Sequence, residues 1–256
     1  MRRCLVIALA LVITLASCGP SEVKSVRAAA PDSVQRDFRT WYAYSMTRTP
    51  LGVAFNAHNE QGAPLTRKAF LEALAGGRYI AVRSGDGPDY ALQPLSSPDK
   101  DIRLTIASMA RTELGHDARV GTPLPPFSFT DIEGRSYTSA GARGKLLVLK
   151  CWFIGCKACV DEFPELNRLV DEYSGRSDVQ FLSLTLDKKS ALDPFLKAFP
   201  FRYAVVPDAE SYVAGALGVE AYPHHLLVSP DGIVLKSTNS LKDLLPALRA
   251  ALPEKG

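Results

Sequence analysis

The feature that most constrains this chain is a run of apolar residues followed directly by two closely spaced cysteines. The segment 146–153 has the length and composition of a buried β-strand, with a single lysine inside it. Cys156 and Cys159 come next, with two residues between them, and a helical pattern over 158–173 starts at once. The sequence therefore predicts a strand, a pair of thiols and a helix in immediate succession.

This order of elements suits thiol chemistry. Two residues between cysteines at a strand-to-helix junction let the two sulfur atoms bond to each other, with Cys156 at the helix entrance. Free backbone N–H groups at that end stabilise a thiolate, and Lys157 adds a cation nearby. Cys159 lies one turn into the helix and should be more shielded. We therefore expect Cys156 to attack a substrate disulfide and Cys159 to resolve the mixed disulfide.

The N-terminus reads as an export signal. Arg2 and Arg3 precede an apolar run over 5–15 that is too short to span a bilayer. The run ends in Leu-Ala-Ser-Cys-Gly over 15–19, which resembles the bacterial lipobox. We expect a signal peptide over 1–17 and a lipid on Cys18, the alternative being ordinary cleavage that leaves Cys18 free. The chain is therefore expected to be a periplasm-facing lipoprotein. Gly19 follows the lipidated cysteine where an aspartate would signal the inner membrane, which favours the outer membrane.

Charge and cysteine content narrow the class of protein. The net charge is +3, from 30 basic and 27 acidic residues, and no dense basic stripe remains once the signal is removed, so nucleic acid is not an expected partner. Of the five cysteines, Cys4 leaves with the signal and Cys18 is taken by lipid, so three remain within nine residues. Clustered cysteines in an exported protein indicate a redox or metal site rather than a disulfide-stapled scaffold. Cys151, inside the strand, is expected to be a core residue.

The chain divides into a tether over 18–36, a small α+β accessory domain over 37–118 and a larger domain over 119–256. In the accessory domain the patterns predict strands over 51–57, 79–83 and 90–95, a helix that Thr66 caps and Gly76 ends, and a helix over 101–114. His58 and His116 are isolated there, and both are expected to be surface or loop histidines.

In the larger domain a hairpin over 127–138 is expected first, and then strands alternate with helices. The predicted strands are 146–153, 179–186, 203–207, 225–229 and 233–237, and the predicted helices are 158–173, 190–199, 211–217 and 241–252. This alternation, closed by a hairpin and a helix, predicts an α/β domain with a mixed sheet and helices on both faces.

The larger domain resembles the thioredoxin fold. The resemblance rests on the strand, the C-x-x-C pair, Pro164 in the following helix and the segment 218–228 around Pro223. It implies a cis bond between Tyr222 and Pro223, a position for Pro223 facing the cysteines, and pairing of the neighbouring backbone with substrate. A cis bond before proline is uncommon, which makes this a sharp expectation.

More narrowly, the run C-x-x-C-x-x-E-F-P and the segment 183–187 resemble the membrane-tethered subgroup typified by TlpA and ResA, which is related to the AhpC/TSA proteins. The resemblance covers about 119–256 and leaves 37–118 unexplained. It implies that Glu162 lies near the thiols, and we expect partial burial to raise its pKa so that it exchanges a proton with Cys159.

The resemblance implies a thiol-disulfide oxidoreductase of the cell envelope, without a cofactor. Its expected partners are envelope proteins with disulfides or dithiols, apocytochrome c among them, and an upstream membrane electron donor. The expected substrate contacts are Trp152, Gly155, Lys157, Ala158 and Tyr222. The chain departs from the family at Gly155, where tryptophan is usual, and at the central dipeptide Lys157-Ala158, which affects the redox potential.

Three alternatives stay open at this stage. The first is a copper chaperone that uses the two cysteines with His224 or His225, because soft thiolates suit Cu(I), although such carriers usually have three residues between their cysteines. The second is a peroxiredoxin-like peroxidase, which needs a threonine where this chain has Phe153. The third is a non-catalytic envelope adaptor whose cysteines serve only structure.

Overall fold

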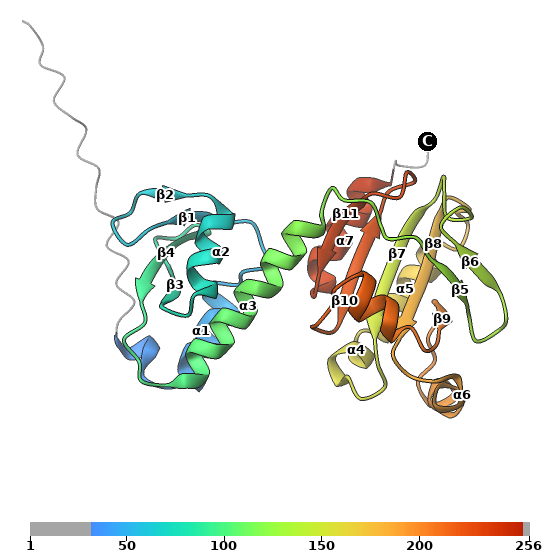
Figure 1. Ribbon diagram of the computed structural model, residues 1–256, viewed down its shortest axis with the longest axis horizontal. Helices are drawn as coiled ribbons and strands as arrows, with labels where there is room; N and C mark the ends of the chain where they lie inside the picture. The colour runs from blue at the N-terminus through green and yellow to red at the C-terminus, as the bar shows by residue number, and fades with distance from the viewer. Residues whose placement is uncertain (1–31, 253–256) are drawn as a thin grey trace, which may run out of the picture.

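The computed structural model describes residues 32–252, and the predicted signal peptide, the lipid on Cys18 and most of the tether lie outside them. The described chain forms two lobes, each with its own sheet, and the long helix α3 leads from the first lobe to the second (Figure 1). Among the helices of 32–252, none combines the length and the apolar character needed to cross a membrane.

The first lobe surrounds a four-stranded sheet in the order β2-β1-β4-β3, in which β1 and β4 run parallel. Its core includes Trp41, Phe70, Leu74, Ile80 and Ile106. The elements in chain order are η1 (Asp32–Gln35), α1 (Phe38–Arg48), β1 (Asn56–His58), β2 (Pro64–Leu65), α2 (Arg67–Ala75), β3 (Tyr79–Arg83), β4 (Asp89–Pro94) and α3 (Lys100–Arg119).

Three features of this lobe differ from the sequence predictions. The strand expected over 51–57 is confined to Asn56–His58. Helix α1 was not predicted, because it buries only Trp41 and Ser45 and so lacks a regular apolar face, although Asp37 caps it by accepting a hydrogen bond from the Thr40 N–H. Helix α3 extends to Arg119, beyond the expected helix end at 114 and one residue past the boundary expected at 118.

The second lobe surrounds a five-stranded mixed sheet in the order β11-β10-β7-β8-β9. Strands β7, β8 and β9 are parallel, whereas β10 is antiparallel to both β7 and β11. The elements in chain order are β5 (Ser128–Thr130), β6 (Ser136–Thr138), β7 (Leu146–Trp152), α4 (Lys157–Asp161), α5 (Phe163–Glu172), β8 (Val179–Thr185), α6 (Lys189–Ala198), β9 (Ala204–Val206), η2 (Ser211–Ala216), β10 (His224–Val228), β11 (Val234–Thr238) and α7 (Leu241–Ala251).

Strand β7 is the buried centre of this lobe, as predicted, and its side chains alternate between two cores. Leu147 and Leu149 face the β5–β6 hairpin and η2. Leu146 and Val148 face α5 and α7. A mixed sheet with these layers and a leading hairpin is a thioredoxin-like fold, so the predicted fold class is confirmed.

The helix expected over 158–173 is two helices, α4 and α5, which meet at Glu162. Pro164 stands in the first turn of α5, where its missing N–H costs nothing, but it could not continue the ladder of α4. The break places Glu162, a predicted site residue, at the junction of the two helices. The Tyr222–Pro223 bond is cis, as predicted.

Candidate redox site

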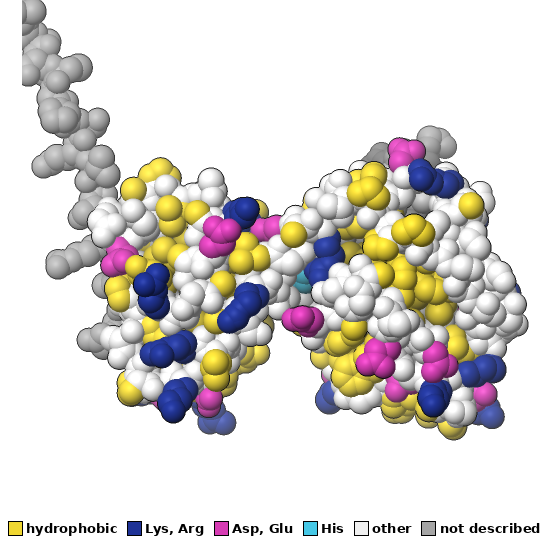
Figure 2. Space-filling view, in the orientation of Figure 1, with side chains coloured by type: hydrophobic (Ala, Val, Ile, Leu, Met, Phe, Trp, Pro, Cys, Tyr) yellow, Lys and Arg dark blue, Asp and Glu magenta, His cyan; other side chains and the backbone are white. Residues whose placement is uncertain are grey.

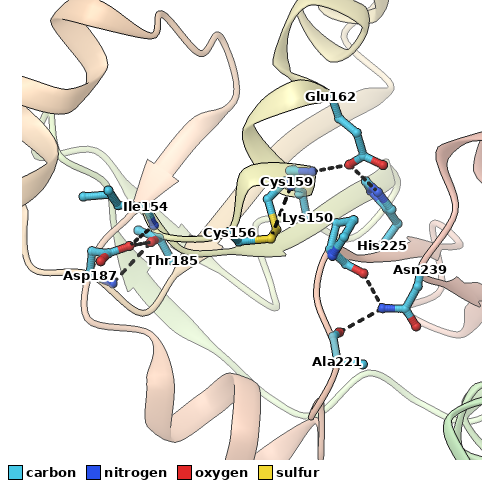
Figure 3. The surroundings of a disulfide bond; sticks show 11 residues. Lys150, Ile154, Cys156, Cys159, Glu162, Thr185, Asp187, Ala221, His225 and Asn239 are labelled. Carbon is cyan, nitrogen blue, oxygen red and sulfur yellow. Dashed lines mark hydrogen bonds and ion pairs between the residues drawn. A yellow bond between two sulfur atoms is a disulfide. The ribbon is translucent and has the colours of Figure 1, made fainter. Parts of the chain in front are cut away.

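Cys156 and Cys159 form a disulfide at the junction of β7 and α4 (Figure 3). Cys156 is the N-cap of α4, and its sulfur atom accepts a hydrogen bond from the Cys159 N–H at 3.2 Å. The Cys156 residue is 9% exposed and Cys159 is 0% exposed. The two cysteines are therefore unequally shielded, since only Cys156 retains any exposed surface.

Small and polar residues surround Cys156 on the surface. Gly155, Lys157 and Ala158 are all exposed. The Lys157 ammonium lies 2.6 Å from the Asp161 carboxylate, one turn along α4, so its charge is directed along the helix rather than at the sulfurs. A side chain at Gly155 would meet the Phe153 ring at 3.3 Å, so the glycine leaves the approach to Cys156 open.

Trp152 was predicted to contact substrate, and its position corrects that prediction. It is fully buried and packs edge-on against Phe163, with 5.0 Å between the ring centres. It belongs to the same core cluster as Cys156 and Cys159. Trp152 therefore supports the disulfide from within, because its side chain has no surface to offer a partner.

Two side chains hold the loops on either side of the disulfide. The Asp187 carboxylate accepts hydrogen bonds from the Ile154 N–H at 2.7 Å and from the Thr185 hydroxyl at 2.8 Å, which fixes the turn before Cys156. The Asn239 amide donates to the carbonyl of Ala221 at 2.8 Å and to that of Pro223, which fixes the cis-proline loop (Figure 3). Neither residue was identified from the sequence, because each acts through a contact between distant segments.

Glu162 takes part in a buried charged cluster that the sequence analysis missed. Its carboxylate oxygen accepts hydrogen bonds from the Lys150 ammonium at 2.5 Å and from the His225 ring at 3.0 Å. Lys150 and His225 are both 0% exposed. Figure 3 shows the three side chains together beside the disulfide.

The expected rise in the pKa of Glu162 is wrong. Burial favours the neutral carboxyl, but the hydrogen bond from His225 and the ammonium of Lys150 together outweigh it and lower the pKa. Burial also lowers the pKa of Lys150, against the pull of the Glu162 carboxylate, and lowers the pKa of His225. At neutral pH Glu162 is therefore a carboxylate and His225 a neutral imidazole, and the 2.5 Å contact pairs the carboxylate with Lys150 as a salt bridge.

The cluster follows from strand register. Lys150 and His225 face each other across the antiparallel pair of β7 and β10, and directly opposed residues point to the same side of the sheet. Glu162 reaches them from the α4–α5 junction above that side. A lysine inside a predicted buried strand needs a partner, so Lys150 itself was the signal in the sequence that could have revealed this cluster.

The copper alternative would use the two cysteines with His224 or His225. These two adjacent histidines lie on opposite faces of the sheet. The His225 ring binds Glu162, whereas the His224 ring accepts or donates a hydrogen bond with Ser237 at 3.2 Å and lies 5.1 Å from the His116 ring. Within 32–252 no three His, Cys, Asp or Glu side chains are grouped closely enough to hold a metal ion. His116, expected at the surface, is instead 3% exposed at the contact between the lobes.

Cys151 is a core residue, as predicted. It is 0% exposed, and burial raises the pKa of its thiol to about 12. Phe153, at the position where a peroxidase would need a threonine, packs its ring on Tyr222 with 5.4 Å between centres and supplies no hydroxyl.

Comparison with known proteins identifies relatives of the second lobe. Residues 120–237 match the AhpC/TSA family. Thiol-disulfide oxidoreductase ResA of Geobacillus thermodenitrificans (strain NG80-2) is 30% identical over 138 residues, which are 52% of this chain and 79% of that protein. ResA of Bacillus subtilis (strain 168) is 26% identical over 117 residues, 45% of this chain and 65% of that protein. A solved thiol-disulfide oxidoreductase from Bacteroides fragilis covers 51% of this chain and 100% of its own, with a TM-score of 0.47 and 26% identity.

The sequence relationship and the geometry agree. The first of these relatives is matched over 79% of its length and is named a thiol-disulfide oxidoreductase, and the matched part of this chain contains the disulfide described above. The chain belongs to the family of ResA-like thiol-disulfide oxidoreductases, related to the AhpC/TSA proteins, and it is a thiol-disulfide oxidoreductase.

Proposed function

We propose that this protein reduces or forms disulfides in partner proteins of the cell envelope through Cys156 and Cys159. The observation that carries the proposal is the unequal exposure of the two cysteines in one disulfide at the start of α4. A two-step exchange requires an attacking thiol that is more accessible than the resolving thiol.

In the reducing direction, the Cys156 thiolate attacks one sulfur of the partner's disulfide and releases the partner's other sulfur as a thiolate. The Cys159 thiolate then attacks the Cys156 sulfur and releases the partner's second thiolate. Two electrons pass to the partner, and the Cys156–Cys159 disulfide remains. An upstream dithiol donor in the membrane restores the reduced enzyme by the reverse sequence.

Cys159 must lose a proton before it can attack, and its buried position excludes bulk water as the acceptor. Glu162 is the carboxylate at hand, three residues further along the chain. Its lowered pKa keeps it charged at neutral pH, so it can take up the Cys159 proton only transiently and returns it readily. Lys150 and His225 position it, and Lys150 loses its charge partner whenever Glu162 is protonated, which favours return of the proton.

The partner would bind along the cis-proline loop and the exposed rim around Cys156. The backbone N–H and C=O of Tyr222 make no hydrogen bond to any other residue of the described chain. Both would be available to a partner strand passing Pro223. Gly155, Lys157 and Ala158 would form the opposite rim, which is open and flat rather than covered by an aromatic side chain.

We place this activity on the outer side of the cytoplasmic membrane. The support is the signal-like start over 1–17, the lipobox-like cysteine at Cys18 and the relationship to ResA. Residues 37–118 would be a separate accessory domain, since their sheet and core are distinct from those of 119–252. Proteins that carry haem-attachment cysteines are the candidate partners.

The proposal is tested by trapping. Cys159→Ala should arrest exchange at the mixed disulfide, so envelope proteins should be recovered covalently bound to Cys156 after expression in the native host. Cys156→Ala is the matched control and should trap none of them. The parent protein should also reduce insulin with dithiothreitol as donor. If the parent leaves insulin intact and Cys159→Ala captures no more than its control, the proposed function is wrong.

A further inference from the structure

The place where the two lobes meet contains a cleft that the redox chemistry does not use. Its volume is about 400 Å³, and it lies between α3 and the residues 218–221 that lead into the cis-proline loop. In Figure 2 basic, acidic and histidine side chains all lie at this waist of the molecule. A polar cleft beside the loop that would receive a partner is a candidate for partner recognition.

One wall of the cleft holds the loop. The Arg119 guanidinium, at the end of α3, donates to the carbonyl of Leu217 at 2.8 Å and to that of Gly218. Burial lowers the pKa of Arg119, and the negative charge of Glu220 opposes that shift. Arg119 is therefore occupied by the loop.

The other arginine of the cleft has no acidic partner among the described residues. Arg111 lines the cleft two turns earlier on α3 and is exposed. It makes no hydrogen bond or ion pair with any other residue in 32–252. An arginine with all its donors free, at the rim of a polar cleft, suits a carboxylate, which it can bind with two parallel hydrogen bonds.

The cleft adjoins the loop along which the partner would bind, because residues 218–221 line it and Tyr222 follows directly in the chain. Glu220 is two residues from Tyr222, and a partner segment in extended conformation advances about 3.3 Å per residue. A partner segment that pairs antiparallel with Tyr222 therefore passes Glu220 and the cleft about two to four residues from its own reactive cysteine. Its side chain at that position would reach the rim that carries Arg111.

We propose that this cleft is a specificity subsite, in which Arg111 binds an Asp or Glu side chain located two to four residues from the partner's reactive cysteine. The proposal rests on the proposed function, because it assumes that the partner lies along Tyr222. It assigns the accessory lobe a role, since α3 supplies the cation and fastens the loop.

The test uses peptides that differ in a single charge. Each carries one cysteine as a 2-thiopyridyl disulfide and has Asp, Asn or Lys three residues from it, so attack by reduced enzyme releases 2-thiopyridone. The Asp peptide should react about three- to fivefold faster than the Asn peptide at low salt, and the Lys peptide should be slowest. Arg111→Glu should invert this order.

Arg103→Glu is the matched control, because Arg103 is exposed on the same helix but does not line the cleft. It should keep the parent's order of rates. Equal rates for the three peptides with the parent protein, or the same inversion in both variants, would overturn the subsite. Failure of the parent to reduce insulin would instead overturn the proposed function, so the two failures are distinct.

Discussion

A lysine side chain without any exposed surface is costly to bury, and Lys150 is stabilised there by the carboxylate of Glu162. His225 donates to the same oxygen atom, so one carboxylate serves two buried groups. Because the imidazole is neutral, the cluster has no net charge. Replacing any single charged member therefore leaves a charge beside the disulfide.

This balance predicts the direction in which the Cys159 thiol responds. Glu162→Gln removes the negative charge and leaves Lys150 unopposed, so the pKa of Cys159 should fall by about one pH unit. Adding Lys150→Met to it restores neutrality and should return the pKa close to the parent value. The measurement is the pH dependence of iodoacetamide alkylation of Cys159 in a Cys156→Ser background.

Glu165→Gln is the control for this series, because Glu165 is exposed one residue past Pro164. It should leave the alkylation profile unchanged. A profile that stays the same in Glu162→Gln would show that the buried cluster serves packing alone.

Among the elements, α3 connects the accessory lobe to the redox lobe through its last turn. Arg119→Met keeps the length of the side chain and removes its hydrogen bonds to the carbonyls of Leu217 and Gly218. Each bond from a charged donor contributes about 1.5–3 kcal/mol, so the segment 217–223 should open more often. Amide hydrogen exchange measured by mass spectrometry should become faster in that segment.

The comparison for α3 is Arg111→Met, because Arg111 is on the same helix but makes no hydrogen bond to the loop among the described residues. Its exchange pattern should match that of the parent. If Arg119→Met also leaves hydrogen exchange over 217–223 unchanged, the hydrogen bonds of Arg119 do not restrain this segment.

The elements that the sequence predicted well are those whose pattern is local. Strand β7 is a continuous apolar run, and the cis bond before Pro223 belongs to a recognisable segment. Helix α1 lacks an apolar stripe, and the break at Glu162 depends on how α4 and α5 pack. The contacts of Lys150 with Glu162, and of Arg119 with the loop, join segments whose pairing no local pattern specifies.

At the scale of the whole molecule, two separate cores meet at a polar contact. Each lobe contains one of the two tryptophans, Trp41 in the first and Trp152 in the second. Fluorescence can therefore follow the lobes one at a time. The contact between them includes the rings of His116 and His224, and the redox lobe also buries His225.

The buried histidines predict that acid destabilises the redox lobe. Burial lowers the pKa of His225 and holds that of His224 well below its ordinary 6.5. Below pH 6.5 the unfolded chain therefore binds protons that the folded lobe does not bind. The free energy of unfolding should fall as the pH drops below 6.5, by up to about 1.4 kcal/mol per pH unit for each histidine. The lowered pKa of Glu162 adds a further loss below 4.5. Urea unfolding of the oxidised Trp41→Phe variant, followed by Trp152 fluorescence from pH 7.5 to 5, measures this slope. Adding His224→Gln and His225→Gln should flatten it, and a parent slope that is already flat would contradict the prediction.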